Sequence, residues 1–131
     1  METHFLKILE IARENVRKNP SIVDVPTTEI CERYLEGLMD EVAEVRAEIR
    51  EHNEVHLTDE LSDIAWDYAV VLALAEYRGL IENAESVLVH GAAKYGERAP
   101  AFLEPSEDMW DAVKAKQKAD LKARHQEKYG T

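Results

Sequence analysis

The sequence predicts an all-α fold, a helical bundle of four to five helices in a single domain that spans residues 1–131. Apolar residues recur at helical spacing through several long segments. No run rich in Val, Ile and Thr alternates with polar residues between hairpin turns, so strands are not expected. Proline and glycine fall between the periodic segments or at their ends, which divides the chain into helices.

The first two expected helices cover residues 2–18 and 28–52. Asn19-Pro20 and Pro26 lie between them, where proline is compatible with a turn or a helix start. Thr27 or Thr28 can cap the second helix with its hydroxyl oxygen. This helix carries an apolar stripe at spacings of three and four: Ile30, Tyr34, Leu38, Val42, Val45 and Ile49.

The remaining helices are expected at residues 58–78, 81–95 and 107–128. Thr58 is suited to cap the third, and Gly79 lies between the third and the fourth. Pro105-Ser106 before Glu107 and Asp108 is a start signal for the last helix, because acids in the first turn complement the helix dipole.

The chain is acidic, with 16 Lys and Arg against 27 Asp and Glu, and its formal net charge is −11. A hydrophobic share of 45% is ordinary for a globular protein. The acidity argues against broad binding to nucleic acid or an anionic membrane surface, which both need a basic face. The longest apolar stretch, residues 64–75, is too short to span a bilayer. We therefore expect a soluble, cytoplasmic protein.

Charge and cysteine content narrow the chemistry further. The single cysteine, Cys31, excludes an intramolecular disulfide and an all-cysteine metal site within one chain. Residues 36–67 contain eleven acids and only two bases, Arg46 and Arg50, and so carry nine of the eleven net negative charges. From Asp111 onward the balance reverses, with six bases against three acids. This polarity is typical either of two solvated faces or of a cation site and an anion site.

Several of the acids occupy positions where apolar residues are expected. In the third helix, Glu60, Asp63 and Asp67 fall within the inward arc; this arc is defined by Leu61, Ile64, Tyr68, Val71 and Leu74. In the second helix, a line of three acids borders the apolar stripe: Glu41, Glu44 and Glu48. A carboxylate on an apolar face costs several kcal/mol unless it is protonated, paired or bound to a cation.

A divalent metal would neutralise these acids. Glu41 with Glu44, and Glu60 with Asp63, each place two carboxylates three residues apart on one helix face. An all-oxygen set suits Mg²⁺, or Mn²⁺ as a substitute, better than zinc. An acidic surface helix pair is the simpler explanation of one such motif, but two motifs on successive helices favour a metal site.

These motifs resemble a known family. Asp40-Glu41-Val42-Ala43-Glu44, followed by Glu60-Leu61-Ser62-Asp63, is similar to the E-E-x-x-E…E-x-x-D pattern of MazG-like nucleoside triphosphate pyrophosphohydrolases. Lys94 to Pro100 resembles the family's K-x-x-x-R-x-P segment, and Trp110 to Lys114 its W-x-x-x-K segment. Asp40 departs from the first Glu of the doublet, and Ala101-Phe102-Leu103 stands where many relatives have His-Val-Phe.

The resemblance implies hydrolysis of a nucleoside triphosphate between the α and β phosphates, in a homodimer or higher homo-oligomer. It implies that Glu41, Glu44, Glu60 and Asp63 hold Mg²⁺ and carry catalysis, with Asp67 a further ligand or an outer acceptor. Lys94, Arg98 and Lys114 would bind phosphate oxygens, and Trp110 would stack on the base or anchor the last helix. Which carboxylate is the general base, how many ions bind and which nucleobase is preferred all stay open.

Other functions remain as alternatives. Within the same chemistry these are a dUTP- or dCTP-selective pyrophosphatase and a phosphoribosyl-ATP pyrophosphohydrolase. A di-iron bundle is disfavoured, because no Glu stands three residues before any of the five histidines. His52 and His56 have the spacing of a zinc pair but lack obvious further ligands. A non-enzymatic helical interaction module, with solvated acids and a basic partner-binding end, is the alternative of a different class.

Overall fold

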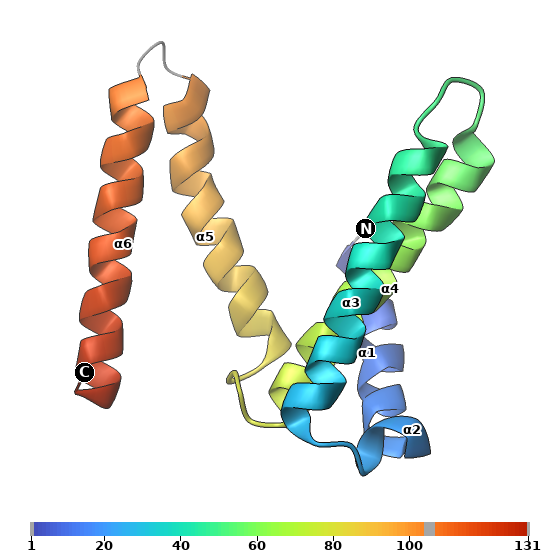
Figure 1. Ribbon diagram of the computed structural model, residues 1–131. Helices are drawn as coiled ribbons and strands as arrows, with labels where there is room; N and C mark the ends of the chain where they lie inside the picture. The colour runs from blue at the N-terminus through green and yellow to red at the C-terminus, as the bar shows by residue number, and fades with distance from the viewer. Residues whose placement is uncertain (1, 104–106, 131) are drawn as a thin grey trace. The chain divides into compact units, whose positions relative to one another are not determined.

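The computed structural model describes residues 2–103 and 107–130, which form helices and the turns that join them, without a strand in this part of the chain (Figure 1). The all-α prediction is therefore confirmed. The helices are α1 (Glu2–Lys18), α2 (Pro20–Val23), α3 (Thr27–Glu48), α4 (Glu54–Tyr77), α5 (Ala84–Leu103) and α6 (Glu107–Tyr129). They form two compact units, Met1–Ala84 and Glu85–Thr131, which we describe separately. No helix among the described residues is both long enough and apolar enough to cross a membrane.

The first unit is built around α4, which packs against both α1 and α3. The C-terminal half of α4 is buried on more than one side, since its neighbours cover opposite flanks; its buried residues are Ala69, Val70, Leu72, Ala73 and Leu74. Helix α1 contributes Leu9, Ala12 and Val16, which lie three and four residues apart and are fully buried. The core of this unit therefore lies along the two faces of α4.

This packing corrects part of the predicted inward arc of α4. Leu61 is 49% exposed and Tyr68 is 37% exposed, although both were expected to face the core. In α3, Val42 and Ile49 are also exposed, at 44% and 65%. Helix α4 packs against two neighbours and so has no single buried stripe, whereas a prediction from periodicity assumes one.

Several polar contacts fix the corners of the first unit. The Arg13 guanidinium of α1 donates two hydrogen bonds to the Glu76 carboxylate of α4, at 2.8 and 2.7 Å. The same carboxylate accepts a bond of 3.0 Å from the Ala84 backbone N–H. Arg78 reaches the Thr27 hydroxyl and the Ile22 carbonyl at 3.1 and 3.0 Å, and so ties the end of α4 to the corner between α2 and α3.

The turn between α3 and α4 lies four residues earlier than the sequence predicts. Helix α3 ends at Glu48 and α4 begins at Glu54, whereas the expected bounds were 52 and 58. Thr58 lies inside α4 and caps nothing, and Pro26 rather than a threonine precedes α3. The buried Asn53 amide donates to the Glu48 carbonyl at 2.8 Å and to its carboxylate at 2.5 Å. His52 completes the turn in the left-handed region at φ 58°.

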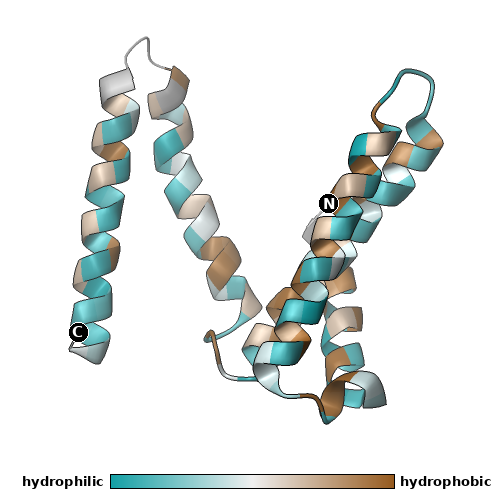
Figure 2. Ribbon diagram, viewed as in Figure 1, coloured by the Kyte–Doolittle hydropathy of each residue, from teal (hydrophilic) through white to brown (hydrophobic). Residues whose placement is uncertain are grey.

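In the second unit, α5 extends beyond its predicted end at residue 95. It includes Pro100 and ends at Leu103, because Gly96 stays helical and a proline removes only one hydrogen bond from the helix. Helix α6 begins at Glu107 as predicted, and the expected Pro105-Ser106 signal lies outside the described residues. Most of α6 is hydrophilic (Figure 2), and its side chains from Lys118 onward are exposed.

Candidate metal centre and phosphate-binding residues

Four carboxylates of the first unit come together between α3 and α4. One oxygen from each of Glu41, Glu44, Glu60 and Asp63 can be chosen so that all four lie within 4.8 Å of one another. Glu41 and Glu44 lie one turn apart on α3, and Glu60 and Asp63 lie one turn apart on α4. The two helices pack side by side in opposite directions (Figure 1), which brings the two pairs to the same level. We call these four residues the carboxylate cluster.

The cluster is partly shielded from solvent. Glu41, Glu60 and Asp63 are half-buried, whereas Glu44 is exposed. Glu41 Oε2 and Glu60 Oε2 are buried without a hydrogen-bond partner within the described parts of the chain. A buried carboxylate oxygen that accepts no hydrogen bond costs free energy of folding, so these two oxygen atoms are suited to coordinate a cation.

Mutual repulsion raises the proton affinity of the cluster. A hydrogen bond with Glu44, together with burial and the nearby charges of Asp63 and Asp67, raises the pKa of Glu41 to about 7. Burial, followed by a hydrogen bond with Glu44, raises the pKa of Glu60. The carboxyls of Glu41 and Glu60 therefore bind protons more readily than ordinary glutamates do, unless a cation offsets the charge around them.

Asp67 lies beside the cluster rather than within it. It is not among the residues whose oxygens meet within 4.8 Å. Burial and the charge of Asp63 raise its pKa. Across the helix pair, its Oδ2 is 3.7 Å from the position that a Cβ would occupy on Gly37. The predicted choice between a direct ligand and an outer acceptor is left open by this arrangement.

The donor set suits a hard divalent cation. It consists of carboxylate oxygens from two helices, with no described histidine or cysteine in the group. Such ions take six or more oxygens, so four carboxylates would leave positions for water or a substrate oxygen. The two unpartnered oxygens and the raised pKa values are what a cation site requires in the absence of its cation.

The predicted phosphate-binding residues all lie in the second unit. Lys94 and Arg98 are one turn apart on α5, and Trp110 and Lys114 are one turn apart on α6. Lys94, Trp110 and Lys114 are half-buried, and Arg98 is only 8% exposed. The ring of Tyr95 lies 5.5 Å from Lys94 Nζ and 5.9 Å from Arg98 Cζ, so both cations flank an aromatic face.

The structure also shows two polar groups that sequence reasoning missed. One is the Asn53 amide, which closes the turn behind the carboxylate cluster. The other is Gln117 of α6, whose side chain contacts both Arg98 and the Lys94 carbonyl. Neither residue has a sequence signal, because a lone amide in a polar stretch looks like any solvated residue.

Comparison with known proteins agrees with this geometry. The model of the MazG nucleotide pyrophosphohydrolase domain matches residues 30–103, more than half of the chain, and this span contains all four carboxylates of the cluster together with Lys94 and Arg98. No curated protein and no solved structure gives a significant match. The chain belongs to the MazG nucleotide pyrophosphohydrolase family.

Proposed function

We propose that this protein is an Mg²⁺-dependent nucleoside triphosphate pyrophosphohydrolase that cleaves between the α and β phosphates and releases a monophosphate and pyrophosphate. The observation that supports this most directly is the carboxylate cluster, in which four oxygens lie within 4.8 Å on a chain of the MazG family. A triphosphate is strongly anionic, so an acidic cluster can engage it only through a cation.

In this proposal, Glu41, Glu44, Glu60 and Asp63 hold the metal, with Mn²⁺ as a substitute and Asp67 as a further ligand or an acceptor behind Asp63. A bound divalent ion would offset charge on the phosphates and lower the pKa of a water that attacks phosphorus. One carboxylate of the cluster would accept the proton of that water. The raised pKa of Glu41 makes this residue a candidate for that role.

Cations of the second unit are proposed to bind the phosphate chain. Lys94, Arg98 and Lys114 would each offer donors to phosphate oxygens, and Arg98 can do so with two parallel N–H groups. Trp110 would stack on the nucleobase. Tyr95 adds a flat surface beside Lys94 and Arg98, which orients both side chains.

The test is a product assay with the common ribo- and deoxyribonucleoside triphosphates in the presence of Mg²⁺. The expected products are a monophosphate and pyrophosphate in equal amounts. Orthophosphate as the first product would overturn cleavage between the α and β phosphates. The same panel identifies a dUTP or dCTP preference, and phosphoribosyl-ATP is added as a separate substrate.

A metal titration separates the enzyme from a non-enzymatic interaction module. Mg²⁺ that binds the folded cluster but not the unfolded chain raises stability by about 2.7 kcal/mol at 100 times its dissociation constant. A module with merely solvated acids would show no such gain. An Asp63→Asn variant should lose the gain, whereas Glu32→Gln, an exposed acid earlier on α3, should keep it.

We further propose that the protein acts in the cytoplasm as a homodimer or higher homo-oligomer, with no nucleic-acid or membrane partner. An exposed apolar stripe on α3 supports self-association, and it consists of Leu35, Met39, Val42 and Ile49. These positions are spaced by four, three and seven residues, which places them along one side of the helix. A second copy of the chain is the proposed occupant of this stripe.

A further inference from the structure

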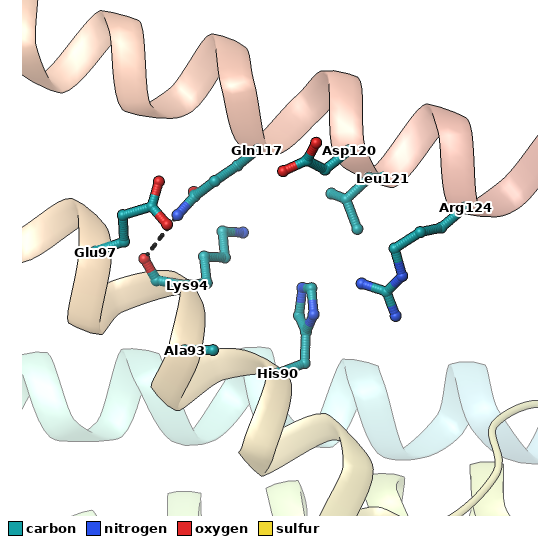
Figure 3. A pocket seen from close by; sticks show the side chains of 8 residues that line it. All are labelled: His90, Ala93, Lys94, Glu97, Gln117, Asp120, Leu121 and Arg124. Carbon is teal, nitrogen blue, oxygen red and sulfur yellow. Dashed lines mark hydrogen bonds between the residues drawn. The ribbon is translucent and has the colours of Figure 1, made fainter.

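Gln117 joins α5 to α6 within the second unit. Its Oε1 accepts a hydrogen bond from Arg98 Nε, and its Nε2 donates one of 3.0 Å to the Lys94 backbone carbonyl. Figure 3 shows the side chain reaching from α6 toward Lys94 of α5, at the edge of an open pocket. One amide thus uses its acceptor and its donor on two successive turns of α5, so its orientation is defined.

The bond to Nε determines how Arg98 presents its charge. Arg98 is 8% exposed, so its side chain is confined. No described residue provides a hydrogen-bond partner for its two terminal Nη atoms, and neither atom is fully enclosed. The side chain is therefore fixed at Nε, while the Nη atoms stay open to an anion.

The acceptor on Gln117 is neutral, which matters for an anionic ligand. A hydrogen bond from Nε to an amide oxygen orients the guanidinium without cancelling its charge. Among the acids whose side chains the structure describes, none lies within ion-pair distance of Arg98, and the neighbouring Glu97 faces Lys116 at 3.7 Å. The full positive charge is then available at the Nη edge.

We propose that Gln117 is a positioning residue, which orients Arg98 so that its two terminal nitrogens bind a phosphate group of the substrate. This inference rests on the proposed function of Arg98 as a phosphate ligand. Gln117 itself need not contact the substrate. Its contribution is to reduce the number of Arg98 rotamers, so that less conformational entropy is lost when the phosphate binds.

The alternative is a merely structural role, in which Gln117 only holds α5 and α6 together. In that case its replacement would weaken pyrophosphate binding only as far as it lowers the stability of the second unit. Two substitutions separate the roles. Gln117→Leu removes both hydrogen bonds at similar volume. Gln117→Glu keeps an acceptor for Arg98 Nε but loses the donor to the Lys94 carbonyl, and its carboxylate pairs with the guanidinium and offsets its charge.

The experiment measures binding of inorganic pyrophosphate in the presence of Mg²⁺ by calorimetry, alongside the melting temperature of each full-length variant. Gln117→Leu should weaken pyrophosphate binding about tenfold, the usual cost of one charge-assisted hydrogen bond. Gln117→Glu should weaken pyrophosphate binding at least as much, because its carboxylate offsets the Arg98 charge, although its ion pair with Arg98 should keep its melting temperature above that of Gln117→Leu. Gln126→Leu, an exposed glutamine on the same helix, is the matched control.

A double-mutant cycle completes the test. In an Arg98→Ala background, Gln117→Leu should cause no further loss of pyrophosphate affinity, because Gln117 acts through Arg98. Additive losses in the double variant, pyrophosphate affinities that follow the melting temperatures of Gln117→Leu and Gln117→Glu, or a wild type that does not bind pyrophosphate would each overturn the inference. A protein that shows the predicted pattern but cleaves no nucleotide would contradict only the proposed function.

Discussion

Glu41 shows how burial and neighbouring carboxylates change the pKa of a single side chain. Its carboxyl is half-buried, and a hydrogen bond with Glu44, burial and the nearby charges of Asp63 and Asp67 raise its pKa to about 7. An ordinary surface glutamate titrates near 4.5. The difference means that the metal-free cluster holds protons that a divalent cation must displace before it can bind.

Substitution within the cluster should remove activity without unfolding the protein. Glu41→Gln and Asp63→Asn each delete one charged ligand while conserving shape, and we expect a fall of at least about 100-fold in kcat/KM, as for loss of a metal ligand. The assay is pyrophosphate release, and circular dichroism checks the fold. Glu32→Gln should retain wild-type turnover. Full activity in either cluster variant would show that the metal assignment is wrong.

The pKa of Glu41 also gives the metal-free protein a characteristic dependence of stability on pH. Because the folded-state pKa is raised above 4.5, the favourable contribution of the protonated group is complete below 4.5 and is lost as the pH rises through about 7. In chelator, the melting temperature should therefore be higher at pH 5 than at pH 8.

Two comparisons test whether Glu41 causes this dependence of stability on pH. Glu41→Gln cannot lose a proton at this position, so its melting temperature should change less between pH 5 and pH 8 than that of the wild type. Mg²⁺ should restore the wild-type melting temperature at pH 8, where the carboxylates are ionised. An equal slope in the variant and the wild type would assign the dependence to other groups.

At the scale of the helices, a bidentate ion pair adds to the apolar packing that joins α1 to α4. The Arg13 hydrogen bonds and the Ala84 N–H lower the pKa of Glu76. The stabilisation is therefore present above pH 4.5 and is lost as the pH falls through the lower folded-state pKa. The pair also holds the start of α5, because Ala84 is the first residue of that helix.

Replacing Glu76 with Gln should lower the free energy of unfolding at pH 7 by about 1–3 kcal/mol, the range for a partly buried charged hydrogen bond. Urea denaturation measures this difference, which should narrow as the pH drops below 4.5. Glu14→Gln is the matched control, because Glu14 pairs with Lys18 on the exposed side of α1 and should contribute little.

The elements also show what sequence could and could not predict. Helix α1 has its predicted bounds, and α6 begins where it was predicted to begin, because apolar periodicity and acids in the first turn act locally. The turn after α3 lies four residues earlier than predicted, because Asn53 closes it through bonds to Glu48. The four carboxylates of the cluster were identified because acids on an apolar face are a strong signal. The contact of Gln117 with Arg98 depends on tertiary geometry and could not be predicted.

For the molecule as a whole, the exposed stripe on α3 leads to a prediction about assembly. Met39 is 72% exposed, so its replacement by lysine should leave the isolated chain stable. In a dimer that buries the stripe, Met39→Lys would place a charge among apolar side chains and shift the population to monomer. Light scattering with size-exclusion chromatography measures the mass.

A lysine on another helix provides the comparison. Ile11 is 53% exposed on α1, outside the stripe, and Ile11→Lys should keep the mass of the wild type. A monomeric wild type at micromolar concentration would contradict the proposed homodimer. Unchanged mass in Met39→Lys would mean that any oligomer uses a different surface.

The arrangement of the first unit, with α4 between α1 and α3, has a consequence for the order of folding. Contact between α3 and α4 closes only the five-residue turn that joins them. Contact between α1 and α4 closes a much longer loop, which costs more conformational entropy. The α3–α4 hairpin is therefore expected to form first, and α1 to dock afterwards. Because that hairpin also brings all four carboxylates together, their repulsion arises early, and divalent ions or protons should accelerate the first folding step as well as stabilise the final structure.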